Sequence, residues 1–292
     1  EGLIQLGQLL NGIQAEVELY VLTAGACLVD AADRVDPEYL AQTSCLLGIT
    51  KALNAELVCV KKVVQIDVDS QMLADPSAIA ESLQTEFRCD HADQEVVIRR
   101  GERHVKRYES VGKTLASEVA ASVEGGTRYF TRGGVYIVTG GLGAIGVEVV
   151  KLVLEVEDTS VLILGRSGDE DERLRVLGWK AEAGGSRVSY AQVDLGIDRR
   201  KLEQQVAGFL RHSGKPLLGV VHLAGHYSRQ QVSELNFQTF ADATKTKVQG
   251  SIDLHHVLKK FSSSEHKPTF LHFGSVASFF AGQGLAAYSG CC

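Results

Sequence analysis

The sequence predicts an α/β fold built on a doubly wound parallel sheet, and three observations support this prediction. The second half of the chain alternates apolar, strand-like runs with helical patterns of about 10–15 residues, an order typical of βαβ units. A glycine-rich turn follows the first of these runs, where a strand would pass into a helix. Apolar residues make up 45% and charged residues 23% of the 292 positions, which is the composition of a globular protein. The expected strands are Val135–Thr139, Ser160–Leu164, Arg187–Val193, Leu217–His222 and Thr269–Phe273, and the expected helices begin near Ala144, Asp169, Asp198 and Phe237.

The first half of the chain shows a shorter version of the same plan. Asp36 and Asp75 each precede a proline, which is the arrangement of an N-cap followed by proline in the first helical turn. We therefore expect one helix from Pro37 to about Leu57 and another over Pro76–Phe87. The expected strands are Glu18–Thr23 and Val58–Asp69, followed by a terminal hairpin of Glu95–Ile98 and the stretch around His104–Tyr108.

Small and polar residues mark a boundary between the two halves, including the pairs Gly125-Gly126 and Gly133-Gly134. We predict a first, Rossmann-like subdomain over 1–112, a linker over 113–133 and a second subdomain over 134–292. The segment Thr23-Ala24-Gly25-Ala26 echoes the glycine-rich turn of the second half but lacks the glycines that should follow. We therefore place no cofactor in the first subdomain.

Charge and hydropathy exclude several classes of function. The net charge is −6, and lysine and arginine are scattered rather than gathered in a patch, so we expect no nucleic-acid partner. Apolar runs are too short to span a bilayer, and the first residues lack the basic and apolar regions of a signal peptide. The six cysteines form no CxxC pair, so we expect reduced thiols and no metal site. Without an export signal or a membrane span, we expect a cytoplasmic protein with no membrane partner.

The glycine-rich turn has the spacing of a dinucleotide-binding loop, because Gly141, Gly143 and Gly146 form a GxGxxG pattern. The glycines allow a tight turn, a close approach of the backbone to a pyrophosphate, and close packing of the helix on the strand. The helix N-terminus then offers unpaired N–H groups to the phosphates. This context favours a Rossmann-type cofactor site over a purely structural turn. Neighbouring candidates for the same site are Thr139, Gly140, Leu142 and Ile145.

The ends of the next two strands supply candidates for the adenosine half of the cofactor. Arg166 and Ser167 follow the second strand, where an acid favours the 2′-hydroxyl of NADH and an arginine accommodates the 2′-phosphate of NADPH. We therefore expect NADPH, the alternative being that Arg166 is a solvated surface residue. Asp194, followed by Leu195, ends the third strand. Its carboxylate either holds the adenine edge or caps the next helix, and the sequence leaves both open.

Further motifs, together with the glycine-rich turn, give the chain a resemblance to a known family. In the second half they are Thr139–Gly146, Arg166-Ser167, His222-Leu223-Ala224-Gly225, Lys247-Val248-Gln249-Gly250, Phe273–Ser278 and Gly284–Tyr288. In the first half they are Cys45–Leu53 and Val64–Asp69. With these motifs the chain resembles the ketoreductase domain of modular polyketide synthases and hybrid nonribosomal peptide synthetases, a branch of the short-chain dehydrogenase/reductases (SDRs). The resemblance implies an SDR-like fold, with the catalytic half at 134–292.

The resemblance also implies which side chains act in catalysis. Reduction of a ketone builds negative charge on the carbonyl oxygen, which requires a proton donor and hydrogen-bond donors. By resemblance Tyr288 is the proton donor, and Ser275, thirteen positions upstream, orients the carbonyl. Lys247 would lower the pKa of the phenol and support the nicotinamide ribose. Taken singly, Ser275 also fits a helix cap, Tyr288 a packing residue and Lys247 a solvated helix charge. The motifs further place His222, Ala224 and Gly225 beside the cofactor.

A domain of this kind uses NADPH to reduce a ketoacyl thioester, β-keto or α-keto, on an acyl or peptidyl carrier protein beside neighbouring megasynthase domains. Two other functions stay open: a catalytically silent structural module of a megasynthase, and a free-standing reductase of small ketones. Cys292 stands where the family has asparagine, which favours the silent module. Tyr227–Arg229 and Phe280 lack the family's stereochemical markers, so the handedness of the alcohol is not predicted. The resemblance implies that both ends of the domain are incomplete here, and we expect this fragment alone to be inactive.

Overall fold

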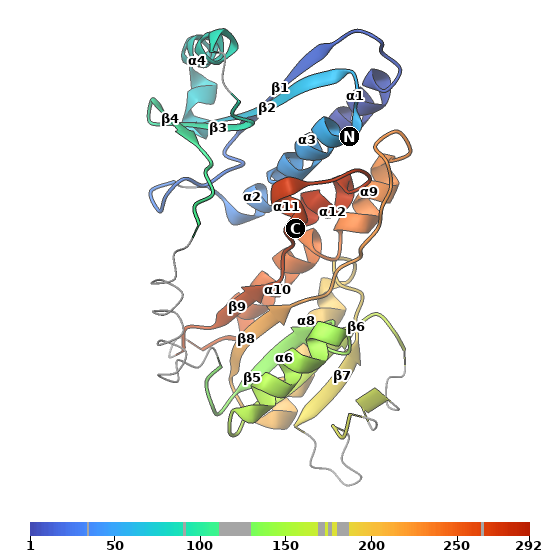
Figure 1. Cartoon of the computed structure of the whole chain (residues 1–292). Helices are drawn as coiled ribbons and strands as arrows, with labels where there is room; N and C mark the ends of the chain where they lie inside the picture. The colour runs from blue at the N-terminus through green and yellow to red at the C-terminus, as the bar shows by residue number, and fades with distance from the viewer. Residues whose placement is uncertain are drawn as a thin grey trace. The chain divides into compact units, whose positions relative to one another are not determined.

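The computed structural model describes residues 1–33, 35–89, 92–110, 130–168, 173–174, 177–179, 187–263 and 266–292. The chain forms two compact units, and Figure 1 shows their elements. The first unit contains residues 1–108, 227–244 and 274–292, and the second contains residues 109–226 and 245–273. This grouping differs from the predicted boundaries, because two segments from late in the sequence pack with the first unit.

A five-stranded, fully parallel sheet forms the centre of the second unit. The chain runs from the central strand β5 outward to β6 and β7, then crosses to β8 and β9 on the other side. The predicted doubly wound sheet is therefore confirmed, and the crevice at the carboxyl ends, where the strand order reverses, is the position at which such sheets bind ligands. The strands are β5 (Val135–Thr139), β6 (Ser160–Gly165), β7 (Val188–Gln192), β8 (Leu217–His222) and β9 (Thr269–His272).

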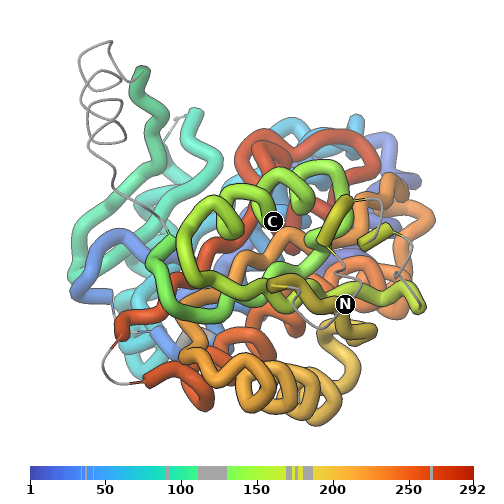
Figure 2. Tube along the Cα trace, turned by 90° about the horizontal axis from the view of Figure 1, so that it is seen from below, coloured from blue at the N-terminus to red at the C-terminus, as the bar shows by residue number. Residues whose placement is uncertain are grey.

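Helices cover both faces of this sheet, which is why β5 is buried along its whole length. One face of β5, including Tyr136 and Val138, packs on α6, and the other, including Val135 and Ile137, packs on α8 and α10. In Figure 2 α6 (green) and α8 (gold) lie on opposite sides of the strands. The helix expected to begin near Asp169 falls outside the described residues. The helices are α6 (Ala144–Glu155), α8 (Arg199–Ser213) and α10 (Val248–Phe261).

A four-stranded sheet forms the centre of the first unit, with three parallel strands followed by an antiparallel hairpin. The predicted hairpin is confirmed, but its second strand begins earlier than expected. Arg100 and Gly101 both have positive φ, 53° and 79°, and Arg99 pairs with Glu102. These two residues make a tight turn of the kind that joins antiparallel strands directly. The strands are β1 (Val17–Ala24), β2 (Val60–Val68), β3 (Glu95–Arg99) and β4 (Glu102–Val105).

Helices of the first unit follow the predicted caps but not every predicted boundary. Asp36 accepts hydrogen bonds from the backbone N–H groups at the start of α2, and Asp75 does the same for α4. The single helix expected from Pro37 to about Leu57 is instead two helices that meet at Ser44. The Thr43 hydroxyl donates to the Tyr39 carbonyl at 2.8 Å just before this break, and such bonds bend helices. The helices are α1 (Gly2–Leu10), α2 (Pro37–Thr43), α3 (Cys45–Glu56), a 3-10 turn η1 (Ser70–Ala74), α4 (Pro76–Arg88), α9 (Phe237–Thr244), α11 (Ala277–Phe280) and α12 (Ala286–Cys291).

The core of the first unit joins segments that are far apart in the sequence. Ile49 and Leu53 of α3 pack in one cluster with Ala286 and Ala287 of α12 and with Leu235. Within the described ranges no helix combines the length and apolar character needed to cross a membrane.

Candidate functional site

The loop between β5 and α6 is shaped by its glycines. Gly140 has φ +68°, and a Cβ there would lie 3.1 Å from the backbone nitrogen of Ala224. A Cβ on Gly146 would lie 2.2 Å from the carbonyl oxygen of Gly140, so the first turn of α6 packs directly on the loop. Gly143 is exposed, and a Cβ there would meet only the Gly140 oxygen, at 3.3 Å. Gly140 and Gly146 therefore fix the turn, whereas Gly143 leaves its backbone open to a ligand.

The N-terminus of α6 faces this loop without a side-chain cap among the described residues, because its N-cap is Gly143. The first N–H groups of any α-helix have no partner inside the helix. In α6 these groups, and the positive end of the helix dipole, are available to an anion.

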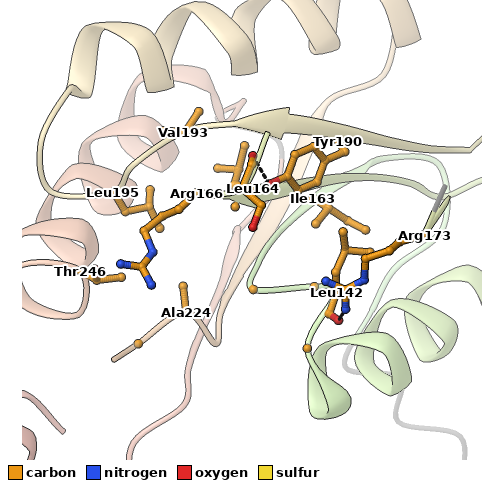
Figure 3. Close-up of a pocket in the computed structure, with 16 residues that line it drawn as sticks. Leu142, Ile163, Leu164, Arg166, Arg173, Tyr190, Val193, Leu195, Ala224 and Thr246 are labelled. Carbon is orange, nitrogen blue, oxygen red and sulfur yellow. Dashed lines mark hydrogen bonds between the residues drawn. The ribbon is translucent and has the colours of Figure 1, made fainter. Parts of the chain in front are cut away.

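A cavity of about 260 Å³ lies beside the loop (Figure 3). It is lined by the glycine loop and by the ends of strands of the second unit, which is where a Rossmann fold binds a dinucleotide. Among the residues predicted to bind the cofactor, those that line the cavity are Gly140, Gly141, Leu142, Gly143, Arg166, Ser167, Leu195, Ala224 and Gly225.

Arg166 and Asp194 carry polar groups that fit the adenosine half of a dinucleotide. Arg166 is exposed, and in Figure 3 its side chain extends toward Thr246. Within the described ranges its guanidinium has no ion-pair partner. One carboxylate oxygen of Asp194 is buried without a hydrogen-bond partner in the described part of the chain. The side chain of Asp198 caps α8, so the alternative that Asp194 caps this helix is wrong. Asp194 itself does not line the cavity, although its neighbours Val193 and Leu195 do.

Thr139 and His222 lie behind the loop rather than in the cavity, and both are fully buried. Oγ1 of Thr139 and Nδ1 of His222 are 2.7 Å apart, and the Ala224 N–H donates to the same Oγ1 at 3.0 Å. Burial, together with the charges of His272 and Lys247, lowers the pKa of His222 to about 3. A neutral His222 therefore braces the end of β5 against the chain that follows β8. Neither Ile145, which is 61% exposed, nor Gly146 lines the cavity.

Several cavity residues lie outside the motifs. The guanidinium of Arg173 donates to the Leu142 carbonyl in the glycine loop, and the Tyr190 hydroxyl donates to the Ser167 carbonyl at 3.0 Å. Figure 3 shows the contact of Arg173 with Leu142. No motif or spacing in the sequence pointed to Tyr190 or Arg173. The remaining lining residues that the sequence did not indicate are Ile163, Leu164, Gly165, Val193 and Thr246.

Ser275 and Tyr288 belong to the first unit, and the structure brings them together. The Ser275 hydroxyl lies close enough to the Tyr288 phenol to affect its pKa. Burial raises the pKa of Tyr288, the nearby Cys292 and Cys291 thiols raise it further, and the Ser275 hydroxyl lowers it. Ser275 Oγ also accepts the Ala277 N–H at 3.2 Å, so the hydroxyl caps the turn that begins α11 as well as contacting the phenol. Its expected cap role and its contact with the tyrosine thus occur together.

Lys247 belongs to the second unit and is only 5% exposed, so it is not a solvated helix charge. Its ammonium donates to the carbonyl oxygen of Phe273, just beyond the end of β9, at 2.6 Å. A Cβ on Gly225 would lie 2.7 Å from the Lys247 Cε, so this glycine makes room for the lysine stem. Gly225 also lines the cavity, which puts the lysine stem directly behind the cavity wall.

These features are typical of a nucleotide-binding α/β protein. They are an open parallel sheet, a glycine loop that leads into a helix N-terminus, and an arginine at the end of the next strand. The family model described as "KR domain" matches residues 134–292, and the chain belongs to this ketoreductase family of the SDR superfamily. Domains of this family bind a nicotinamide cofactor.

Two kinds of relatives agree with this assignment. In an alignment of 298 positions that covers 98% of its length, the chain is 24% identical to erythronolide synthase EryA3 of Saccharopolyspora erythraea. It is similar in fold to a structure titled as an adenylation, ketoreductase and pseudo-Asub multidomain structure of a keto acid-selecting NRPS module (TM-score 0.77, 21% identity). A ketoreductase domain from the bacillaene assembly line is also similar in fold (TM-score 0.71, 18% identity). These two matches cover 99% of this chain and 23% and 62% of theirs.

The curated relatives are much longer than this chain. It spans 8% of EryA3 and 11% of a phenolphthiocerol/phthiocerol polyketide synthase of Mycobacterium tuberculosis, to which it is 26% identical over 223 residues, or 76% of its length. These relatives are polyketide synthases with many domains, and this chain corresponds to one part of them.

Proposed function

We propose that this chain is a ketoreductase domain that uses NADPH to reduce a ketoacyl thioester held by a carrier protein. The observation that carries the proposal is the proximity of the Ser275 hydroxyl to the Tyr288 phenol. The tyrosine has an acidic proton to give, and the serine has a second donor for the same oxygen. A site that reduces a ketone needs both, because negative charge develops on the carbonyl oxygen.

In the proposed reaction the Tyr288 phenol donates its proton to the carbonyl oxygen, and the Ser275 hydroxyl donates a hydrogen bond to the same atom. Bound NADPH would supply the hydride. Ser275 lowers the pKa of the phenol, which opposes the effect of burial and eases the proton transfer. An ammonium has three N–H donors, so Lys247 retains donors for the nicotinamide ribose beyond the one that Phe273 accepts.

Preference for NADPH over NADH is proposed from Arg166. Its guanidinium lines the cavity, carries a permanent charge and has no ion-pair partner among the described residues. Burial of phosphate oxygens against such a group forms charge-assisted hydrogen bonds. Ser167 and the N-terminus of α6 add uncharged donors beside it.

A carrier-bound substrate and neighbouring megasynthase domains are proposed from the relatives named above, which are much longer polyketide synthases. The substrate class stays a ketoacyl thioester, and the similarity to a ketoreductase in a keto acid-selecting module makes an α-keto thioester part of the test beside a β-keto one.

The test uses the complete ketoreductase domain. It measures NADPH oxidation with β-ketoacyl and α-ketoacyl thioester mimics, and NADPH binding by fluorescence titration. Tyr288→Phe should lower turnover by about 10²- to 10⁴-fold, the usual contribution of a general acid. The dissociation constant of NADPH should stay unchanged, because the phenol hydroxyl acts in the transition state. A protein that binds NADPH but reduces neither mimic would instead support the silent structural module. Normal turnover by Tyr288→Phe would show that another group is the acid.

A further inference from the structure

Helix α3 packs directly against the segment that carries Tyr288. A Cβ on Gly48 would lie 2.3 Å from the backbone nitrogen of Gly290, so α3 and α12 meet backbone to backbone. Three residues further along α3, the Lys51 ammonium donates a hydrogen bond to the Ser278 carbonyl at 2.8 Å. Both contacts lie within the first unit. α3 therefore holds the chain on both sides of the loop 281–285, which leads into α12.

Glu56, the last residue of α3, binds two backbone N–H groups with one carboxylate. Oε1 accepts from Gly284 at 2.9 Å, and Oε2 accepts from Val232 at 2.7 Å. Gly284 has φ +72°, and its carbonyl accepts the N–H of Gln230 at 2.8 Å. Among the residues that the structure describes, the Glu56 carboxylate has no ion-pair partner. Its charge is therefore used to join two loops, 229–235 and 281–285.

Each loop is next in sequence to a residue or helix that contacts or carries Tyr288. Gly284 precedes the tyrosine by four residues, which is about one helical turn. Tyr227, just ahead of the other loop, contacts the tyrosine ring, with ring centroids 5.0 Å apart. A carboxylate suits this junction because its two oxygens can each accept a charge-assisted hydrogen bond. A glutamine amide has only one acceptor oxygen, and its NH2 group, which can only donate, would face the second backbone N–H.

We propose that Glu56 is a positioning residue for Tyr288. Its carboxylate fixes the loops that precede α9 and α12, and through them the place of the phenol. The inference rests on the proton-donor role proposed above for Tyr288. Glu56 lies outside the motifs and in the half of the chain that the sequence predicts to be structural. Its effect is geometric, and a displacement of about 1 Å in a catalytic group can cost on the order of 10² in rate.

The experiment compares Glu56→Gln with the wild type, both prepared in the complete ketoreductase domain. We expect kcat for a ketoacyl thioester mimic to fall by about ten- to a hundredfold, because the phenol is displaced. The NADPH dissociation constant should not change, because the cavity is built within the second unit. Hydrogen exchange of the Gly284, Val232 and Tyr288 amides should become at least about tenfold faster, since one of the two acceptors is lost.

Glu86→Gln is the matched control. Its carboxylate also lies in the first unit and accepts hydrogen bonds, but its side chain is 2% exposed and it pairs with Arg103 rather than with the loops near Tyr288. This variant should lower the melting temperature while leaving kcat and the exchange of the Gly284 amide unchanged. A fall in kcat equal to that of Glu56→Gln would mean that any loss of stability in the first unit has the same effect, and would overturn the proposal.

Hydrogen exchange of the backbone amides tests the positioning role of Glu56 even in a protein without measurable turnover. Unchanged exchange of the Gly284 and Val232 amides in Glu56→Gln overturns the positioning role. So does unchanged kcat in a chain whose wild type turns over. A wild type that binds NADPH but reduces no thioester refutes the proposed function instead. In that case faster exchange at the Tyr288 amide supports the positioning role, and unchanged exchange refutes it.

Discussion

Gly143 is the N-cap of α6 and Gly146 lies in the first turn of the same helix, and substitutions at the two positions should have opposite effects. In Gly146→Ala the new Cβ would lie 2.2 Å from the Gly140 oxygen and 2.7 Å from the Gly141 Cα. Both are backbone atoms, which cannot rotate away, and ordinary contact begins at 3.4 Å, so α6 must shift by about 1 Å. Overpacking of this kind costs about 1–3 kcal/mol. A domain of this size loses roughly 2–4 °C per kcal/mol, so we expect the melting temperature to fall by about 2–12 °C.

Gly143→Val should leave the fold intact and remove cofactor binding. Gly143 has φ −74° and ψ 169°, which any residue adopts, and its closest neighbour is an oxygen at 3.3 Å. The branched side chain would instead occupy the edge of the cavity where a pyrophosphate meets the loop. Loss of two charge-assisted hydrogen bonds, about 1.5–3 kcal/mol each, would weaken NADPH binding by at least about a hundredfold.

The assay pairs thermal unfolding, followed by circular dichroism, with fluorescence titration of NADPH for both variants and the wild type. Wild-type NADPH affinity in Gly143→Val would show that the loop is only a turn. Equal losses of melting temperature in the two variants would show that the packing of Gly146 against Gly140 does not distinguish them, which would refute the reasoning from backbone distances.

Two further predictions concern the same unit. Arg166→Asp should weaken NADPH by roughly ten- to a hundredfold and spare NADH, because a charge-assisted contact is worth about 1.5–3 kcal/mol; equal loss of both cofactors in titrations would contradict the assignment. Burial lowers the pKa of His222 to about 3 from its ordinary 6.5, so between these values the unfolded chain binds a proton that the folded chain does not. Acid therefore destabilises the fold over this range by up to about 1.4 kcal/mol per pH unit. His222→Gln should flatten that slope in denaturant titrations between about pH 4 and 6.5, and an unchanged slope would show that other groups cause it.

Local signals explain why so much of the second unit could be predicted from the sequence. Continuous apolar runs such as Val135–Thr139 and Leu217–His222 are buried on both faces, so each strand was visible by itself. Helix caps are local signals too: Asp198 caps a helix of the second unit, and Asp36 and Asp75 cap helices of the first. Each of these side chains binds N–H groups within three residues of its own position. The break at Ser44 escaped prediction, because the helical pattern continues across it.

Contacts over long sequence separations explain what could not be predicted at the site. Glu56 and Gly284 are 228 positions apart, and no pattern near either residue indicates the other. Arg173 reaches a backbone carbonyl, that of Leu142, and a backbone acceptor leaves no signal in the sequence. Sequence motifs contain the residues that contact a common ligand. Residues that position those motifs, such as Glu56 and Arg173, are set by the three-dimensional fold and leave no pattern in the sequence.

The ends of the first strands of the two units differ in what binds their backbone N–H groups. After β1 the backbone N–H groups of Ala26 and Cys27 point at a carboxylate of the chain itself, Asp67 of β2, at 2.9 and 3.1 Å. Asp67 is fully buried and also pairs with the buried guanidinium of Arg99. In the second unit the comparable turn after β5 is followed by glycines, and an open cavity lies beside it. Backbone N–H groups after a first strand favour an anion in both units. The internal carboxylate and its arginine satisfy that preference in one, while the glycines and Arg166 leave it for a phosphate in the other.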